Sequence, residues 1–488
     1  MSALTIGKPG FFRFRWYTFL AAFLILPNLP LLLGAHPISL LARGYVDLDY
    51  LLIGLLSLFV PRMVTFVLLA AAVLFDFVHA VCVTYLFAPS EFFHVVRYGG
   101  LLSTTRVGLI ASATVFTLLI CLATTAFASR RAAGRQRRIA IVTMSGTMLL
   151  FALADVPAAH RVLQDTGEPV SGRLTRTPTL GLIYGQIIYD RYQRGQRLGG
   201  QYAMPSATSL ALNYLADYPA RDSAGTAQDL RPNLVLVLVE SWGLARDPAL
   251  RSAMFEPYSD PALLAKYEVL RGTMPFQGPT TAGEKRELCQ SHMGLDFAQG
   301  TPAQLERCVP SRMRRAGYRT LAVHGFSGDF FDRKDWYPKL GFEDIWFHDR
   351  LRAAGLPDCG GPFPGTCDDA VAGWLSERLR QPGDAPLFVH WVTLNSHLPI
   401  SPPYRIKSPR PCNVSSITRD DAAVCTWYQL VSVANQSVHD LALGSIGRAT
   451  IFIVVGDHAP PFDTDVERAQ FSATQVPYVI LLPKEDAR

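Results

Sequence analysis

The chain has 488 residues, of which 49% are hydrophobic and only 18% are charged, and its formal net charge is +6. Its mean hydropathy of +0.18 is higher than that of ordinary soluble domains. This composition excludes a purely soluble globular protein and indicates that part of the chain lies in a membrane.

Long apolar segments follow one another in the N-terminal third of the chain. A helix needs roughly 20 apolar residues to cross the hydrocarbon core. Four segments approach or exceed that length, namely 16–33, 63–87, 107–128 and 139–154. A fifth segment, 50–60, is shorter than a full span and would form a hairpin with the segment after Pro61. We therefore predict an α-helical transmembrane domain of five spans over residues 1–157.

Basic residues predict the orientation of these helices. The loop before the last segment is rich in arginine, and such loops stay in the cytoplasm. Its arginines are Arg130, Arg131, Arg135, Arg137 and Arg138. Five spans then place everything after Asp155 outside, and the first segment remains as an anchor because no cleavage site follows it. We expect a multi-pass membrane protein with an extracytoplasmic domain.

Two ionisable residues lie inside a predicted span. Asp76 and His79 are three residues apart, so they share one face of a helix. Ionisable groups inside a membrane are costly, which suggests a function. The simpler alternative is an interfacial pair in a helix that ends early.

Residues 158–230 are polar and rich in arginine and glycine. Within them, apolar residues recur at helical intervals over 180–196, which predicts a helix lying along the membrane surface. An ordinary interdomain linker is the alternative. We interpret 158–230 as a connector.

Six of the eight cysteines lie in the outer portion of the chain. They form three local pairs: Cys289 with Cys308, Cys359 with Cys367, and Cys412 with Cys425. An even number at short separations predicts disulfides formed in an oxidising compartment. Other connectivities, and unpaired buried thiols, stay open.

Strand-like and helix-like segments alternate over residues 231–488. Five runs of β-branched and aliphatic residues predict strands that are buried on both faces. These runs are 233–240, 319–326, 386–394, 450–457 and 476–483. Amphipathic segments separate them, so we predict an α/β domain whose helices cover the sheet. In such folds ligands gather beyond the carboxyl ends of the strands.

Candidate metal ligands stand at these strand ends. Glu240 follows the first run, and Asp457 and His458 follow the fourth. Carboxylates and imidazole are ligands for zinc or manganese. The sequence therefore predicts one divalent metal site that leaves a position for a nucleophile.

A threonine in the segment GPTTAGE is the candidate nucleophile. Thr280 precedes a predicted helix, whose N-terminal N–H groups favour a bound phosphate. Metal contact would lower the pKa of its hydroxyl and make the alkoxide available. Thr281 is the neighbouring alternative, and the position of Thr280 within the motif favours Thr280.

Taken together, these segments resemble the membrane-anchored, sulfatase-like branch of the alkaline phosphatase superfamily, which contains lipoteichoic acid synthases, phosphoglycerol transferases and phosphoethanolamine transferases. The resemblance covers most of the chain. It implies an alkaline phosphatase-like fold and one zinc or manganese ion. It also allows a second metal ion when substrate is bound. It implies that Glu240, Asp457 and His458 bind the metal with the nucleophile Thr280, and that His397 in TLNSHLPI binds substrate.

A further segment bears on the head group. HGFSGDFFDRKDWYPKLGFEDIW resembles the phosphoglycerol-transferase pattern, which implies that His324, Phe331 and Arg333 contact the head group. Phe331 stands where that branch often has tryptophan. The paired cysteines resemble the phosphoethanolamine branch instead, so the head group stays open.

Two other residues have simpler interpretations. His390 alternates along a predicted strand and is interpreted as a hydrogen-bonded core residue. Cys308 begins CVPSR, the short core of the sulfatase signature in which cysteine becomes formylglycine. We reject that role, because the following residues lack the expected Leu and Thr-Gly and because Cys289 is a plausible disulfide partner.

The predicted function is a metal-dependent transfer of a phospholipid head group, phosphoethanolamine or phosphoglycerol, through a phosphothreonine intermediate. The partners would be a membrane phospholipid donor and an envelope glycan or lipid acceptor, with no nucleic acid. The alternative is a membrane-anchored phosphodiesterase or sulfuric ester hydrolase that uses the same metal site. A non-catalytic envelope scaffold is a third hypothesis.

Overall fold

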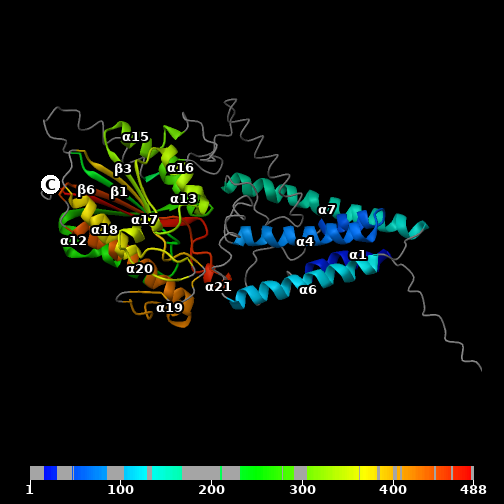
Figure 1. The fold of residues 1–488 in the computed structure, drawn as a ribbon. Helices are drawn as coiled ribbons and strands as arrows, with labels where there is room; N and C mark the ends of the chain where they lie inside the picture. The colour runs from blue at the N-terminus through cyan, green and yellow to red at the C-terminus, as the bar shows by residue number, and fades with distance from the viewer. Residues whose placement is uncertain are drawn as a thin grey trace, which may run out of the picture. The chain divides into compact units, whose positions relative to one another are not determined.

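The computed structural model divides the chain into two compact units, residues 1–84 with 103–202 and residues 85–102 with 203–488 (Figure 1). It describes residues 16–29, 47, 49–84, 104–128, 134–166, 209–210, 231–276, 278–290, 305–361, 363–381, 385–398, 400, 404–406, 409–444, 447–462 and 465–484.

Helices of the N-terminal unit form where the sequence predicts its five apolar segments. They are α1 (Trp16–Ile25), which continues into η1 (Leu26–Asn28), α3 (Asp49–Ser57), α4 (Arg62–Thr84), α6 (Thr104–Ala128) and α7 (Gly134–Thr166). Over the described part of the chain, none of these helices is both long enough and apolar enough to cross a membrane. The predicted helices are confirmed as secondary structure, whereas the prediction that they span a membrane is not shown by the structure.

Aromatic and aliphatic side chains form the centre of this unit. Phe23 and Tyr50 are fully buried and pack with Met144 of α7. Asp76 is also buried, and its Oδ2 accepts a hydrogen bond of 2.6 Å from the Tyr50 hydroxyl. The side chain of His79 and the predicted helix at 180–196 lie outside the described residues, so the predicted Asp76–His79 pair and the connector stay predictions.

A sheet of seven strands forms the second unit. Its strands are β1 (Asn233–Val239), β2 (Tyr267–Pro275), β3 (Arg319–His324), β4 (Asp344–Trp346), β5 (Leu387–Val392), β6 (Thr450–Gly456) and β7 (Gln475–Pro483). Their order is β2-β7-β6-β1-β5-β3-β4. The five predicted strands are confirmed. The sequence missed β2 and β4, because β2 lies at one edge with half-exposed, partly charged residues and β4 has only three residues.

Strand direction decides which residues can meet. β6, β1, β5, β3 and β4 run parallel, so their carboxyl ends lie at one edge of the sheet. β7 runs antiparallel to β6, so its carboxyl end lies at the opposite edge. β1 is the centre of the sheet, and every one of its residues is buried. The predicted ligand-binding edge is therefore formed by β1, β3, β5 and β6.

Helices cover both faces of this sheet (Figure 1). On one face, α18 (Asp368–Arg380) and α20 (Ala422–Leu443), the two amphipathic segments that the sequence predicts, share a core with α11 (Pro248–Phe255) and α12 (Pro261–Lys266). On the other face lie α13 (Thr280–Cys289), α15 (Val309–Arg315) and α16 (Arg333–Leu340). Shorter elements are η4 (Glu256–Ser259), η5 (Phe330–Asp332), α17 (His348–Ala353), α19 (Ser416–Asp420) and α21 (Asp465–Arg468).

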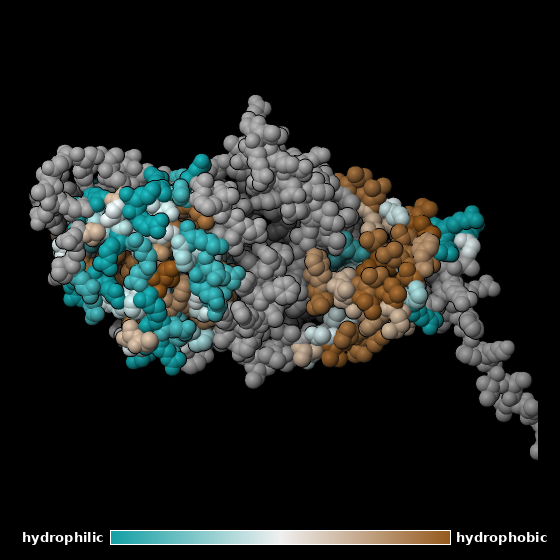
Figure 2. Space-filling model, turned by 45° about the horizontal axis from the view of Figure 1, so that its top comes forward, coloured by the Kyte–Doolittle hydropathy of each residue, from teal (hydrophilic) through white to brown (hydrophobic). Residues whose placement is uncertain are grey.

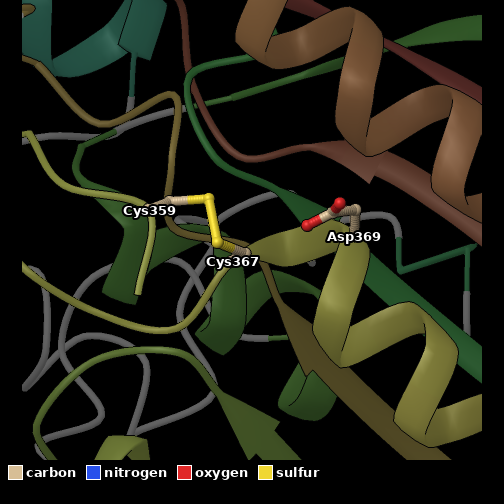
Figure 3. A group of neighbouring side chains, drawn as sticks. All are labelled: Cys359, Cys367 and Asp369. Atoms are coloured by element: carbon tan, nitrogen blue, oxygen red, sulfur yellow. A yellow bond between two sulfur atoms is a disulfide. The ribbon is translucent and has the colours of Figure 1, made fainter. Parts of the chain in front are cut away.

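Three disulfides join the cysteine pairs that the sequence predicts, Cys289–Cys308, Cys359–Cys367 and Cys412–Cys425. Cys359 and Cys367 lie close to Asp369 in an arrangement that could suggest a metal site. Figure 3 shows that their two sulfur atoms are bonded to each other. Since metals bind the thiolate, this group is a disulfide beside a carboxylate.

Candidate active site

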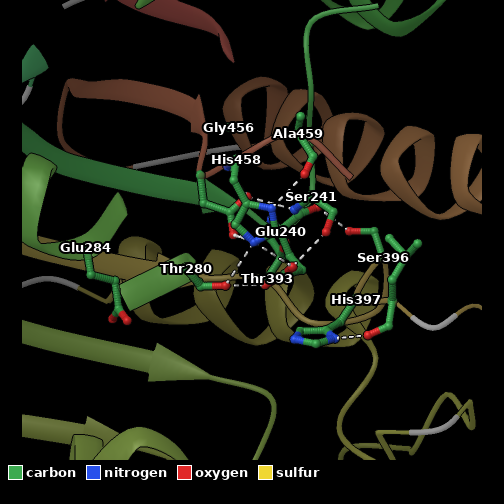
Figure 4. Close-up of polar contacts among 12 residues, drawn as sticks. Glu240, Ser241, Thr280, Glu284, Thr393, Ser396, His397, Gly456, His458 and Ala459 are labelled. Carbon is green, nitrogen blue, oxygen red and sulfur yellow. Dashed lines mark hydrogen bonds and ion pairs between the residues drawn. The ribbon is translucent and has the colours of Figure 1, made fainter. Parts of the chain in front are cut away.

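The loop after β1 holds Glu240 in a fixed position. The Glu240 N–H donates to Thr393 Oγ1 at 2.9 Å, and the Ser396 hydroxyl donates to the Glu240 carbonyl at 2.6 Å. Ser241 has a left-handed backbone, with φ of 55°, and its hydroxyl donates to Glu240 Oε1 at 2.8 Å. The strained turn and the loop after β5 thus aim this carboxylate at the edge of the sheet (Figure 4).

Asp457 and His458 follow β6 and face Glu240. Asp457 Oδ1 accepts the backbone N–H groups of Ser241 and His458 at 2.8 and 2.6 Å, whereas its buried Oδ2 has no hydrogen-bond partner. His458 Nδ1 donates to the Ala459 carbonyl at 2.9 Å. This leaves His458 Nε2 as the nitrogen that faces Asp457 Oδ2 at 3.4 Å and Glu240 Oε1 at 3.6 Å.

Thr280 is the first residue of α13, two residues before the predicted helix start. Its hydroxyl donates to Glu240 Oε2 at 2.9 Å and lies 3.5 Å from His458 Nε2. Gly283 allows this approach, because a Cβ there would lie 3.0 Å from Asp457 Cβ. Arg286 fastens the same helix by donating to the Gly456 carbonyl at 2.9 Å. Thr281 is buried as well.

The cluster of Glu240, Asp457 and His458 has the properties of a metal site. One ligand atom from each residue lies within 4.8 Å of the others, and all three residues are buried. Burial and then the Glu240 charge raise the pKa of Asp457 to about 7. Burial lowers the pKa of His458, but the two carboxylates outweigh it and raise that pKa overall. A divalent cation would satisfy the unpartnered Asp457 Oδ2 and relieve this repulsion, so the residues present fit zinc or manganese.

Glu284, one turn after Thr280, lies in a second buried cluster. Arg333 Nε and Nη2 donate to its Oε2 at 3.0 and 2.8 Å, and the Tyr337 hydroxyl donates to its Oε1 at 2.5 Å. His390 Nε2 lies 3.4 Å from the same Oε1. Burial would raise the pKa of Glu284, but Arg333 and His390 outweigh it and lower that pKa to about 2. The interpretation of His390 as a hydrogen-bonded core residue agrees with this arrangement.

The four predicted head-group residues have different environments. Arg333 is buried and forms an ion pair with Glu284, so its guanidinium also stabilises the fold. Phe331 is buried with φ of 57°. His324 Nδ1 contacts the Val392 carbonyl at 3.1 Å. His397 is partly exposed, and its Nδ1 donates to the Leu398 carbonyl at 2.5 Å.

Several polar residues that build the site were missed from the sequence. Thr393 and Ser396 hold Glu240, and Asp368 and Asn395 hold the loop between them. All except Asp368 lie in TLNSHLPI, directly after β5. A search for hydroxyl and amide side chains after each predicted strand would have found them. The sequence also contains no indication of the role of Glu284, although this residue ends the segment GPTTAGE.

Acidification should remove the contribution of His324 to the stability of this unit. Burial, with the Arg333 charge, lowers the pKa of His324 to about 3, below the unfolded value of about 6.5. The unfolded state therefore takes up a proton first as the pH falls through 6.5, and the contribution of His324 to stability, which is complete above 6.5, is lost progressively below it. At pH 5 this contribution is lower by about 2 kcal/mol.

The measurement is denaturant unfolding at pH 7 and pH 5, in chelator so that metal release does not contribute. Between these pH values the stability of the wild type should fall by about 2 kcal/mol relative to that of His324→Gln, because the opposing effect of Asp457, whose pKa is raised, is common to both proteins. Equal changes in both proteins would contradict the assignment.

Cys308 does not meet the requirement for formylglycine formation. Its sulfur is bonded to Cys289, and the residue is 1% exposed. Conversion to formylglycine needs a free thiol, so the rejection of the sulfatase-type cysteine nucleophile agrees with the structure.

Part of this chain is similar to a protein that is already known. A protein from Rhizobium meliloti (strain 1021), named for cyclic beta-1,2-glucan modification, is 26% identical over 255 residues, which are 49% of this chain and 38% of that protein. The match thus spans well under half of the relative's length.

Solved structures also match. A protein in the alkaline phosphatase superfamily from Vibrio parahaemolyticus has 18% identity and a TM-score of 0.38, with 53% of this chain and 61% of that chain covered. The lipoteichoic acid synthase LtaP from Listeria monocytogenes has 15% identity and a TM-score of 0.37, with 51% and 65% covered. The family model described as Sulfatase matches residues 232–488, more than half of the chain. The chain therefore belongs to the sulfatase family.

Proposed function

We propose that this protein is a metal-dependent transferase that moves phosphoethanolamine or phosphoglycerol from a membrane phospholipid to an envelope acceptor. The observation that carries the proposal is the Thr280 hydroxyl, which lies 2.9 Å from Glu240 within the cluster that contains the unpartnered Asp457 Oδ2. A hydroxyl nucleophile beside a metal site suits substitution at phosphorus.

Glu240, Asp457, His458 and Thr280 would hold one zinc or manganese ion. When bound, the ion lowers the pKa of the Thr280 hydroxyl and stabilises negative charge on the phosphate. Glu240 Oε2 orients the hydroxyl, and the His458 Nδ1–H bond to Ala459 leaves Nε2 available as a ligand. The positive end of the α13 helix dipole would favour a phosphate next to Thr280.

The reaction proceeds in two substitutions. In the first, Thr280 Oγ1 forms a bond to phosphorus, the bond from phosphorus to the diacylglycerol oxygen breaks, and the proton that Thr280 loses is transferred to that oxygen. A phosphothreonine that bears the head group remains. In the second, an acceptor hydroxyl forms the new bond to phosphorus, Thr280 Oγ1 leaves, and the acceptor's proton returns to it. His324, His397 and Arg333 would bind the phosphate or the polar head group.

The proposal includes attachment to the bacterial inner membrane through the N-terminal unit, with the catalytic unit in the periplasm. Large apolar side chains on its helices are exposed, among them Met63 at 73%, Val142 at 71% and Leu150 at 66%. Figure 2 shows this hydrophobic surface in brown. An exposed apolar surface of this kind suits contact with lipid, and three disulfides suit an oxidising compartment. Attachment near the lipid donor would raise its effective concentration.

The proposed acceptor is an envelope glucan. Support comes from the name of the Rhizobium meliloti relative, which refers to cyclic beta-1,2-glucan. A glucan offers many hydroxyl groups that could attack the phosphothreonine.

The test is mass spectrometry of the purified full-length protein after incubation with phosphatidylethanolamine or phosphatidylglycerol. A head-group phosphate attached to Thr280 is expected with one of the two lipids, and its mass identifies the head group. When cyclic glucan is added, Thr280 should lose the head-group phosphate and the glucan should gain the same mass. Release of the head group to water at equal rates with and without glucan would favour the hydrolase instead, and an unmodified Thr280 with both lipids would reject the transferase.

A further inference from the structure

A short loop closed by a disulfide lies between two segments of the site. Cys359 and Cys367 are eight residues apart and are bonded. The Cys359 N–H donates to the Gly365 carbonyl, and the Cys367 N–H donates to the Pro357 carbonyl, each at 3.0 Å. The loop is therefore closed by one covalent bond and by backbone hydrogen bonds at the same place.

One side of this loop packs on the segment after β3. The Thr366 N–H donates to the carbonyl of Gly325, the residue after His324, at 2.9 Å. The approach is so close that a Cβ on Gly365 would collide with the Gly325 carbonyl oxygen. The Thr366 hydroxyl also contacts His348 Nδ1 at 3.1 Å. The loop is thus docked directly on the backbone that carries a predicted head-group residue.

The end of the loop is tied to the segment that leads to His397. Asp368 directly follows Cys367 and is buried. Its carboxylate accepts the N–H groups of Leu394 and Asn395 at 3.0 and 2.9 Å, and its own N–H donates to Asn395 Oδ1 at 2.7 Å. Asp368, which is next to the disulfide, therefore holds the backbone just before His397.

Phe363 projects from this loop onto His397. The two ring centroids are 4.1 Å apart, with an angle of 52° between the ring planes. Phe363 also contacts Phe326 and Phe330, at 5.6 and 6.0 Å between centroids, and it packs on a buried cluster that includes Leu394. It is half-buried. One face of the His397 imidazole is thus covered by an aromatic ring.

We propose that Phe363, held in place by the Cys359–Cys367 loop, positions the His397 imidazole and so sets the affinity of the site for the phosphate head group. This inference rests on the proposed function. The hydrogen bond from His397 Nδ1 to the Leu398 carbonyl limits rotation of the imidazole within its plane. The Phe363 ring limits tilting of that plane. Together they fix the direction of Nε2, the nitrogen left to contact substrate. Phe363 is a positioning residue because it acts through His397.

The test compares Phe363→Ala with Phe363→Tyr in the purified full-length protein. Without the ring, His397 can rotate away from the head-group phosphate, and loss of a hydrogen bond to a charged group costs roughly 10- to 100-fold in binding. We expect Phe363→Ala to raise KM for the phospholipid donor by that amount while kcat changes less than about threefold. Phe363→Tyr keeps the ring and should restore KM.

Disulfide removal gives an independent test with a matched control. Cys359→Ser/Cys367→Ser should raise KM in the same direction as Phe363→Ala, because the loop then loses its closure. Cys412→Ser/Cys425→Ser removes a disulfide between the segment before α19 and the first turn of α20, so it should leave KM unchanged. An equal rise in KM in both pairs would indicate a general loss of structure and overturn the inference.

Binding of phosphoethanolamine and sn-glycerol 1-phosphate, measured by calorimetry, separates this inference from the proposed function. If wild-type Thr280 is modified and Phe363→Ala has wild-type KM and binding, the inference is wrong and the transferase stands. If the wild type binds a head-group phosphate but Thr280 stays unmodified, the transferase is wrong, and weaker binding by Phe363→Ala would still support the inference. A wild type that binds neither compound overturns both.

Discussion

Replacement of Thr280 by alanine is expected to reduce head-group transfer by roughly 10³-fold or more, because the variant lacks the hydroxyl that is proposed to form the covalent intermediate. The Thr280 hydroxyl is at hydrogen-bonding distance from Glu240 Oε2 and His458 Nε2. The measurement is transfer from phospholipid to glucan by the full-length protein, together with the mass of the peptide that contains residue 280.

Two matched variants control this result. Thr281→Ala changes the neighbouring buried hydroxyl and should keep transfer within about tenfold of wild type. Thr280→Ser keeps a hydroxyl at the start of α13 and should form the adduct on serine. If Thr281→Ala abolishes the adduct while Thr280→Ala retains it, the nucleophile is Thr281 and the preference for Thr280 is wrong.

Breaking the buried Glu284–Arg333 pair is expected to cost about 3–5 kcal/mol of unfolding free energy. Both side chains are buried, with exposed fractions of 0% and 1%, and Arg333 donates twice to Glu284 Oε2. Glu284→Gln would leave the guanidinium without its counter-charge in a low-dielectric environment, which explains the size of the effect. The measurement is denaturant unfolding of the wild type and the variant at pH 7.

A double-mutant cycle distinguishes this charge effect from a packing effect. Glu284→Gln combined with Arg333→Met removes both charges and should recover part of the lost stability. Glu268 lies in the exposed part of β2, so Glu268→Gln should change stability by less than about 0.5 kcal/mol. Additive effects of the two substitutions at Glu284 and Arg333 would contradict a coupled buried pair.

The strands of the catalytic unit could be predicted because they are buried on both faces. β1 reads NLVLVLV and β6 reads TIFIVVG, and both are buried throughout. Such unbroken runs are characteristic of central parallel strands. β2 carries Glu268 and Arg271 and is half-exposed, so its pattern gives a much weaker signal. It becomes a strand only because it pairs with β7.

The four proposed metal and nucleophile residues were named from local motifs, but their meeting depends on the fold. Glu240 and His458 are brought together because β1 pairs in parallel with β6. Thr280 joins them because α13 packs against the end of β6, where Gly283 lies close to Asp457. Motifs give the chemistry of each side chain, and strand pairing gives their distances.

Head-group recognition is where local motifs were least informative. The segment from His324 to Arg333 predicts a set of substrate contacts, but its sequence gives no sign that Arg333 pairs with Glu284 49 residues earlier. The contact of Phe363 with His397 is equally invisible in the sequence, because it depends on the docking of a disulfide-closed loop.

The sequence by itself determined the apolar N-terminal segments and the buried strands, and it named the cysteine pairs and the candidate residues of the site. These depend on composition, periodicity and short motifs, which are local properties of the chain. Only the tertiary structure decided the unpartnered Asp457 Oδ2, the neutralisation of Arg333 by Glu284 and the covering of His397 by Phe363. Each of these depends on distances between residues far apart in the sequence, and such distances are set by strand order and helix packing.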